Sequence, residues 1–324
     1  MTSGIVRVIS GRRLRDLVPI ADAIEAVRGA FQAVSEGHID QVPRTALPDG
    51  SLLTMAAHGI GSSGTSVKVV GVRQDATQPQ LPLINAVVLW FDHSTGLPVA
   101  VLEGSELTAL RTGAASGVAT DLLAAPDASV LAMIGSGAQA ADQVFAVCSV
   151  RRIETVRIFS RNAATAAGLA KRLGAALPEV EVHVSTDIRS ATADADVVCT
   201  ATTATSPLIH GGDLSERTHI NAIGAYRPDM CEISPEVIAE ATTVAIDHSP
   251  AARAEAGDLL QAAAAGKFAL HDAIELGKLV SLPGRAYTGW TVFKSVGIGA
   301  QDWAVAKLAV DRSEGHELPK ISLR

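Results

Sequence analysis

The 324 residues of the chain are 48% hydrophobic and 19% charged, a balance that predicts a packed globular protein and excludes a disordered one. A chain of this length predicts two domains. The formal net charge is -7 and no block of like charges occurs, so the sequence lacks the basic surface that nucleic acids or anionic membranes attract.

The cysteines and the apolar segments indicate where the protein works. Cys148, Cys199 and Cys231 are far apart and have no metal-binding spacing, which predicts a reducing compartment and no metal site. The first residues carry arginines within their apolar stretch, and no apolar run reaches about 18 residues, so neither a secretion signal nor a membrane span is expected. We therefore expect a cytoplasmic protein.

The first third of the chain predicts a sheet with one long helix. Residues 6–9 form a strand-like run, and apolar residues then recur every three or four positions over residues 19–37, which indicates an amphipathic helix. Strand-like runs follow at residues 51–60, 66–72, 84–92 and 97–103. The last two of them are joined by a glycine-containing connection typical of a hairpin. A further helix is predicted over residues 106–124.

Strand-like and helix-like runs alternate from residue 129 onward. The strand-like runs lie at residues 129–135, 155–160, 180–185, 196–202, 218–224 and 242–249. Such alternation predicts right-handed crossovers and a doubly wound parallel sheet. The predicted fold class is therefore α/β, with a Rossmann domain over residues 119–302 and a smaller α+β domain formed by residues 1–118 and 303–324.

A glycine-rich turn follows the first of these strand-like runs. Gly135, Gly137 and Ala140 fit the pattern G-x-G-x-x-A, in which the glycines allow a tight turn and a close approach of the backbone to a pyrophosphate. The helix that follows offers unpaired N–H groups and a partial positive charge. Glycine-rich turns also occur without a ligand, but the position between a strand and a helix favours dinucleotide binding.

The end of the next strand bears on the choice of dinucleotide. Ser160, Arg161 and Asn162 stand where an acidic residue would bind the ribose of NAD, and an arginine there suits a 2′-phosphate. NADP(H) is therefore favoured, and NAD(H) stays open because Arg161 could instead begin a solvated helix. Thr202 and Thr203 follow the fourth strand, where ligands of open sheets bind.

Seven motifs spread over the chain resemble one family. They include "LTALRT" and "FKSVG" and lie at residues 42–44, 67–70, 94–116, 134–140, 223–233, 255–259 and 291–306. Together they resemble the ornithine cyclodeaminase and mu-crystallin family. The resemblance implies a homodimer, a substrate-binding and dimerising domain made of the N-terminal third and the C-terminal helix, and a Rossmann domain between them. It also implies hydride transfer between nicotinamide and a C=N bond of an imino or amino acid.

The resemblance assigns the substrate side to Arg44, Lys68 and Arg111, and catalysis to Lys68 and Asp229. A guanidinium can hold a carboxylate with two hydrogen bonds, and a lysine in an apolar strand has its pKa lowered toward a value useful for proton transfer. Asp229 could pass a proton to or from the substrate nitrogen. Without the resemblance, Arg44 would be read as a surface arginine, Arg111 as half of a salt bridge, and Asp229 as a turn residue.

The predicted cofactor contacts come from both the turn and the family motifs. They are Arg111, Thr112, Gly135, Gly137, Ala138, Gln139, Ser160, Arg161, Asn162, Thr202, Thr203, Gly224, Asp229 and Ser295. Lys294, next to Ser295, is assigned a structural role.

Two departures separate the chain from ornithine cyclodeaminase itself. Residues 70–73 are Val-Gly-Val-Arg where that enzyme has Asn-Gly-His-Pro, and residues 160–162 lack its acidic residue. We therefore expect NAD(P)H-dependent reduction of a cyclic ketimine carboxylate of the pyrroline or piperideine type. Ornithine cyclodeaminase, alanine dehydrogenase and a dinucleotide-containing binding protein with little turnover are the alternatives.

Overall fold

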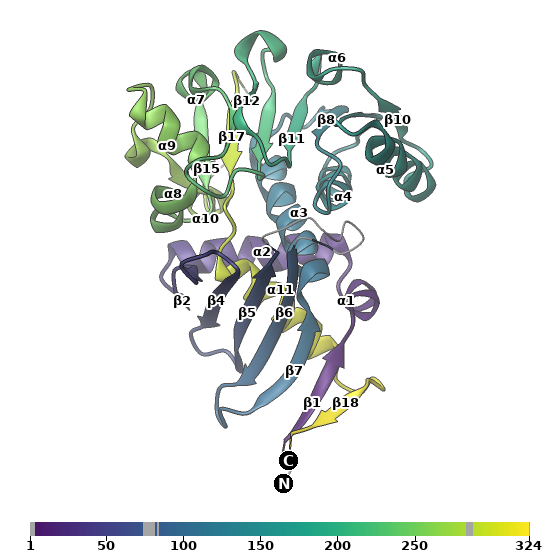
Figure 1. Cartoon of the computed structure of the whole chain (residues 1–324), viewed down its shortest axis with the longest axis vertical. Coiled ribbons are helices and arrows are strands. Elements are labelled where there is room, and N and C mark those ends of the chain that lie inside the picture. Colours follow the sequence, from purple (N-terminus) through teal and green to yellow (C-terminus); the bar gives the residue numbers. More distant parts are fainter. Residues whose placement is uncertain (1–3, 74–81, 83, 283–287, 324) are drawn as a thin grey trace. The chain divides into compact units, whose positions relative to one another are not determined.

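The computed structural model describes residues 4–73, 82, 84–282 and 288–323, and it divides into two compact units. Unit 1 comprises Met1–Arg111 and Ile298–Arg324, and unit 2 comprises Thr112–Gly297 (Figure 1). The first division falls inside helix α3 (Gly104–Leu123) rather than near residue 118, and the second falls before residue 298 rather than at residue 303. Because an unbroken helix crosses the first division, no loop or change of composition marks it in the sequence.

Unit 1 is built on an eight-stranded sheet in which β3 pairs only with β4 and the other strands follow the order β18-β1-β7-β6-β5-β4-β2. Apart from the parallel pair β1 and β7, the pairings are antiparallel, and β6 and β7 form the expected hairpin. The elements in chain order are β1 (Ile5–Ile9), α1 (Gly11–Leu17), α2 (Ile20–Ser35), β2 (Ile39–Gln41), β3 (Thr45–Ala46), β4 (Leu52–Gly59), β5 (Gly64–Val72), β6 (Ile84–Asp92), β7 (Pro98–Glu103), the start of α3, α11 (Gly299–Arg312) and β18 (Lys320–Ser322).

Helix α11 lies on one face of this sheet, against β4, β5 and β6, and helix α2 packs on α11 (Figure 1). The alternation of a strand sends every second side chain toward α11, so Ser66, Lys68 and Val70 of β5 are buried while the residues between them are half-buried. Helix α2 buries its apolar stripe, including Ile24, Val27 and Phe31, as its three- and four-residue spacing predicts.

Unit 2 contains an eight-stranded sheet in which every pairing is parallel, in the order β10-β9-β8-β11-β13-β17-β15-β16. The expected doubly wound sheet is confirmed. Its elements are β8 (Val130–Ile134), α4 (Ala140–Val150), β9 (Thr155–Phe159), α5 (Ala163–Ala176), β10 (Glu181–Val184), α6 (Ile188–Thr192), β11 (Val197–Thr200), β13 (His219–Ala222), α7 (Pro235–Glu240), β15 (Thr243–Ile246), α8 (Ser249–Glu255), α9 (Gly257–Ala264), β16 (Ile274–Glu275), α10 (Leu276–Val280) and β17 (Thr291–Lys294).

Both faces of the parallel sheet are covered. Leu131 and Met133 of β8 enter one apolar cluster, whereas Ala132 and Ile134 of the same strand enter the other. Helices α4 and α5 contribute to the first cluster, and α7, α8 and α9 contribute to the second. This two-sided burial is typical of parallel sheets and leaves the ends of the strands as the places where polar groups can gather.

Two features of unit 2 were not predicted. Strand β17 lies between β13 and β15 although it is the last strand of the unit in the sequence. Strands β12 (Thr205–Ile209) and β14 (Cys231–Ile233) pair with each other in a separate two-stranded sheet. All four residues of β17 and all three of β14 are buried, so neither strand shows the polar and apolar alternation that would reveal it.

Candidate functional site

A buried group of charges lies between the sheet of unit 1 and helix α11. Lys68 Nζ is 2.8 Å from both carboxylate oxygens of Asp302, and Arg111 Nε is 3.1 Å from Asp302 Oδ1. Lys68, Arg111 and Asp302 are 2%, 5% and 1% exposed. Two cations therefore share one carboxylate in a place that water scarcely reaches.

Three elements bring these side chains together. The pleat of β5 directs Lys68 toward α11, and Asp302 lies in the first turn of α11. Arg111 comes from α3, and its Nη1 donates a 2.7 Å hydrogen bond to Gln301 Oε1. The same oxygen accepts from the backbone N–H of Ile298, so the start of α11 holds the guanidinium in a defined orientation.

The charge balance of this group lowers the pKa of Lys68 to about 7. Burial is the largest cause; Asp302 opposes it, while the positive charges of Arg111 and Arg44 add to it. The three cations that the family resemblance placed on the substrate side therefore act on one another. With one carboxylate among them, they leave a net positive charge that suits an anionic ligand.

Asp302 was not singled out from the sequence. Its only local signal is an acidic residue in the first turn of a helix, which also favours a helix N-terminus for ordinary reasons. The partner that makes it informative, Lys68, lies 234 positions away in the chain. The pair could be recognised only once the sheet and the last helix were placed together.

The glycine-rich turn in unit 2 has the conformation its pattern requires. Gly135 has a φ of +113°, and a Cβ there would lie 2.6 Å from the carbonyl oxygen of Ala201. A Cβ on Gly137 would meet nothing within 4 Å, so the backbone at this exposed position is open to a ligand. Ala138 is exposed and Gln139 precedes the first residue of α4, so the turn leads directly into the N-terminus of that helix.

Two of the three residues that follow β9 have distinct roles: Arg161 is an exposed cation, and Asn162 caps the next helix. Asn162 Oδ1 accepts hydrogen bonds from the backbone N–H groups of Ala164 and Thr165, at 3.0 and 3.1 Å, and so caps α5. The carbonyl oxygen of this side chain is therefore already engaged within the chain. Arg161 is exposed, and Ser160 beside it is half-buried.

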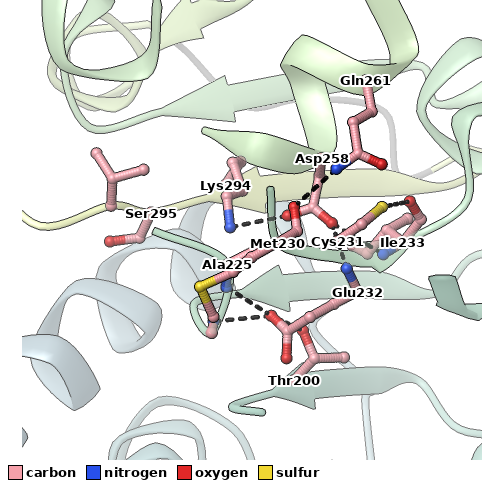
Figure 2. A network of polar contacts seen from close by, with 12 residues as sticks. Thr200, Ala225, Met230, Cys231, Glu232, Ile233, Asp258, Gln261, Lys294 and Ser295 are labelled. Carbon is pink, nitrogen blue, oxygen red and sulfur yellow. Dashed lines mark hydrogen bonds and ion pairs between the residues drawn. The ribbon is translucent and has the colours of Figure 1, made fainter. Parts of the chain in front are cut away.

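A network of buried charges holds the loops that follow β11 and β13 (Figure 2). Glu232 of β14 accepts hydrogen bonds from the backbone N–H groups of Thr202 and Gly224, both at 2.7 Å. Thr202 and Gly224, predicted as cofactor contacts, are thus joined through one carboxylate, whereas Thr203 is exposed. Lys294 Nζ lies 2.8 Å from Asp258 Oδ2, and both side chains are fully buried.

Ser295 is held by another buried carboxylate, that of Asp247. Its Oγ donates to Asp247 Oδ2 at 3.0 Å, and the same oxygen accepts from the backbone N–H groups of Val296 and Gly297. Glu232, Asp258 and Asp247 were all missed from the sequence. Glu232 and Asp258 lie inside the motifs at residues 223–233 and 255–259, but a single buried acid there has no spacing pattern of its own, and most of the groups that these carboxylates hold are distant in the chain.

Asp229 lies in an exposed loop of unit 2, where it pairs with Arg227 at 3.0 Å. Helix α9 steadies this loop, because Gln261 Nε2 donates to the carbonyl oxygens of Pro228 and Met230. Thr112, another predicted cofactor contact, is buried and is the first residue of unit 2. Asp229 thus belongs to a different unit from Lys68, the other residue predicted to be catalytic.

The described part of the chain offers neither a membrane-spanning helix nor a cluster of metal ligands. None of its helices is both long enough and apolar enough to span a membrane. Its histidine, cysteine, aspartate and glutamate side chains form no group of three or more that could hold a metal ion.

The fold and these sites define a two-unit α/β protein with a glycine-rich turn on a doubly wound sheet and a buried cationic group in the other unit. The sequence profile of the ornithine cyclodeaminase/mu-crystallin family matches residues 8–317, and the chain belongs to this family.

The similarity to known proteins extends over almost the whole chain. A Delta(1)-pyrroline-2-carboxylate reductase of Bacillus cereus is 36% identical over 96% of this chain and 99% of its own length. The ketimine reductase mu-crystallin of Rattus norvegicus is 33% identical over 92% of this chain and 93% of its own. The structure of Thermococcus litoralis Delta(1)-pyrroline-2-carboxylate reductase in complex with NADH and L-proline covers 98% of this chain and 100% of that chain, with 31% identity and a TM-score of 0.91.

Proposed function

We propose that this protein is an NAD(P)H-dependent oxidoreductase that reduces a cyclic ketimine carboxylate of the pyrroline or piperideine type to the corresponding L-amino acid. The observation that carries the proposal is the buried group of Lys68, Arg111 and Asp302, with Arg44 acting on it electrostatically. Reductases of pyrroline-2-carboxylate and of ketimines among the relatives support the same chemistry.

The side chains of the group have separate tasks. Arg44 and Arg111 bind the substrate carboxylate, since a planar guanidinium matches its two oxygens. Protonated Lys68 donates a proton to the substrate nitrogen, which makes the C=N carbon a better acceptor. Asp302 orients the Lys68 ammonium and keeps it charged. The nicotinamide dinucleotide, when bound, supplies the hydride to that carbon, and Asp229 serves as the second proton-transfer residue.

The dinucleotide binds at the glycine-rich turn of unit 2 in this proposal. The open backbone of Gly137 and the N-terminus of α4 would hold its pyrophosphate. We favour NADP(H), because exposed Arg161 can bind a 2′-phosphate and residues 160–162 carry no repelling carboxylate. The Thermococcus litoralis relative is in complex with NADH, so NADH is the necessary comparison.

A homodimer is also part of the proposal. The face of the unit 1 sheet that points away from α11 carries half-buried apolar side chains in cross-strand pairs, including Val67 with Leu89 and Val69 with Val87. A second copy of the chain would cover this apolar surface.

The test is a spectrophotometric assay with the purified protein. We expect NADPH absorbance to fall when pyrroline-2-carboxylate or piperideine-2-carboxylate is added, and L-proline or L-pipecolate to accumulate. Release of ammonia and proline from ornithine without added NADPH would contradict the reductase assignment and indicate a cyclodeaminase. Reduction of pyruvate in the presence of ammonia, with no reduction of cyclic imines, would indicate an alanine dehydrogenase. Dinucleotide binding without any of these reactions would indicate a binding protein.

A further inference from the structure

Glu232 is a fully buried carboxylate, and Figure 2 shows it between Ala225 and Thr200. Oε1 accepts from the backbone N–H and the hydroxyl of Thr202, at 2.7 and 2.8 Å. Oε2 accepts from the backbone N–H groups of Gly224 and Ala225, at 2.7 and 3.2 Å, and from the hydroxyl of Thr200 at 2.9 Å. Five donors therefore converge on one side chain.

The two loops lie at the same edge of the parallel sheet. One follows β11 and the other follows β13, and these strands are neighbours in the sheet. Carboxyl ends of adjacent parallel strands meet at one edge, which is where doubly wound sheets bind their ligands. Glu232 is on neither strand, so its carboxylate connects the two loops from outside the sheet.

The glycine-rich turn is in direct contact with the first of these loops. Gly135 closely approaches the carbonyl oxygen of Ala201, the residue before Thr202. Gly224 in the second loop is equally confined, because a Cβ there would overlap both Thr202 and the Glu232 carboxylate. A shift of the Glu232 carboxylate would therefore move both loops and the surface on which the turn rests.

Burial raises the pKa of Glu232, whereas the charge of Lys294 and the hydrogen bonds from Thr202 oppose this rise, and the donors favour a carboxylate over an amide at this position. The backbone N–H groups of Thr202, Gly224 and Ala225 can only donate, and between them they approach both oxygens of Glu232. A carboxamide of the same size would direct its NH2 group at one of these N–H groups. One loop would then lose its acceptor while the other kept it.

A second ion pair holds Glu232 itself. Asp258 Oδ1 accepts from the backbone N–H groups of Glu232 and Ile233, at 2.6 and 2.9 Å. Its other oxygen is 2.8 Å from Lys294 Nζ, on β17, the next strand in the sheet after β13. Lys294 and Asp258 thus fix the backbone from which the Glu232 side chain extends.

We propose that Glu232 is a positioning residue for the dinucleotide, which it serves by fixing the two loops beside the glycine-rich turn, with Asp258 and Lys294 holding it in place. This rests on the dinucleotide-dependent reduction proposed above. Glu232 touches neither substrate nor dinucleotide in this role, so it should affect dinucleotide affinity and not the chemical step.

The test is Glu232→Gln, measured by calorimetric titration with NADPH and with NADH at a temperature where the variant is folded. Loss of a hydrogen bond between a charged acceptor and buried N–H groups should raise the Kd of the dinucleotide about tenfold or more. At saturating dinucleotide, kcat should stay close to that of the unmodified protein. A general loss of stability would lower the Tm, but it would not raise the Kd while leaving kcat unchanged.

Asp196→Asn is the matched control. Asp196 Oδ2 also accepts from two backbone N–H groups, those of Ser129 and Val130, at 2.8 and 2.9 Å. Ser129 directly precedes β8 and Val130 is its first residue, so both groups lie at the opposite edge of the same sheet, away from the glycine-rich turn. We expect this variant to lower the Tm and to leave the Kd unchanged.

The outcomes separate the two proposals. If the unmodified protein binds neither NADPH nor NADH, the proposed function fails and this inference fails with it. If the unmodified protein binds a dinucleotide and Glu232→Gln binds it as tightly as Asp196→Asn does, the positioning role alone is wrong. Should Glu232→Gln not fold, Thr200→Val removes one donor to Oε2 inside β11; an unchanged Kd in that variant would overturn the inference.

Discussion

Lys68 is buried where its charged form is disfavoured, and Asp302 is the group that opposes this penalty. The pKa of the lysine falls from its ordinary value of 10.5 to about 7, so the side chain is protonated below about pH 7 and neutral above it. If protonated Lys68 is the proton donor, kcat/KM for the imine should fall as pH rises through about 7. A pH profile of kcat/KM measures this, and a flat profile there would contradict the assignment.

The variant Asp302→Asn tests the same prediction through the partner of Lys68. Removing the carboxylate removes the influence that raises the pKa of Lys68, so the descending limb of the profile should move to lower pH. Asp311→Asn is the control, because exposed Asp311 lies on the same helix α11 and pairs with Lys307 instead. An Asp302→Asn profile that coincides with that of Asp311→Asn would show that Asp302 does not set the protonation of Lys68.

Asp229 is predicted to transfer a proton although its carboxylate is exposed and paired with Arg227. Asp229→Ala should lower kcat by about 10²-fold and leave dinucleotide binding intact, which is the size of effect expected for a proton-transfer residue. The measurement is kcat together with the Kd for NADPH. Asp127→Ala, which breaks another exposed pair in unit 2 with Arg217, should change neither. Equal kcat values for the two variants would remove Asp229 from the mechanism.

Arg161 is the one exposed cation in the stretch that bears on the choice of dinucleotide, residues 160–162. Arg161→Asp should shift the preference from NADPH toward NADH, because a carboxylate repels a 2′-phosphate and accepts from a ribose hydroxyl. The ratio of kcat/KM for NADPH to that for NADH reports the change. An unchanged ratio would remove the basis for favouring NADP(H).

At the scale of elements, the two glycines of the turn are predicted to serve different purposes. Gly135 is needed for folding and Gly137 for binding the dinucleotide. Gly135→Ala combines a φ of +113° with a close contact to Ala201 and should cost about 1–3 kcal/mol of stability. Gly137→Ala enters open space, so it should leave the free energy of unfolding nearly unchanged and weaken NADPH binding. Denaturant unfolding and titration with NADPH measure the two effects. Equal stability losses in both variants would contradict this division.

The elements that could be predicted are those with a local signature. Residues 84–92 were expected as a strand and form β6 over Ile84–Asp92, and the expected helix over residues 19–37 is α2 over Ile20–Ser35. Strand β17 has no such signature, because its four residues are all buried and its neighbours β13 and β15 precede it in the chain. Its position in the sheet depends on pairing between distant segments.

At the scale of the whole molecule, the outer face of the unit 1 sheet predicts the oligomeric state. Leu89→Arg places a charge among the half-buried side chains of Val67 and Val101 and should convert a dimer to a monomer. Analytical ultracentrifugation distinguishes the two states. Leu282→Arg, at an exposed leucine of unit 2, should leave the dimer intact. A Leu89→Arg protein that sediments like the unmodified dimer would show that this face is not the interface.

The sequence by itself determined the alternation of strands and helices from β8 to β15, the doubly wound sheet and the glycine-rich turn, because these patterns depend on residues close together in the chain. Motifs that resemble the family also pointed to Arg44, Lys68 and Arg111, whose role on the substrate side stays a prediction. Only the tertiary structure decided which carboxylate faces which cation: Asp302 with Lys68, and Asp258 with Lys294. A buried charge needs a partner, but residues far apart in the chain can supply it, so the pairing is defined only when the strands and helices pack.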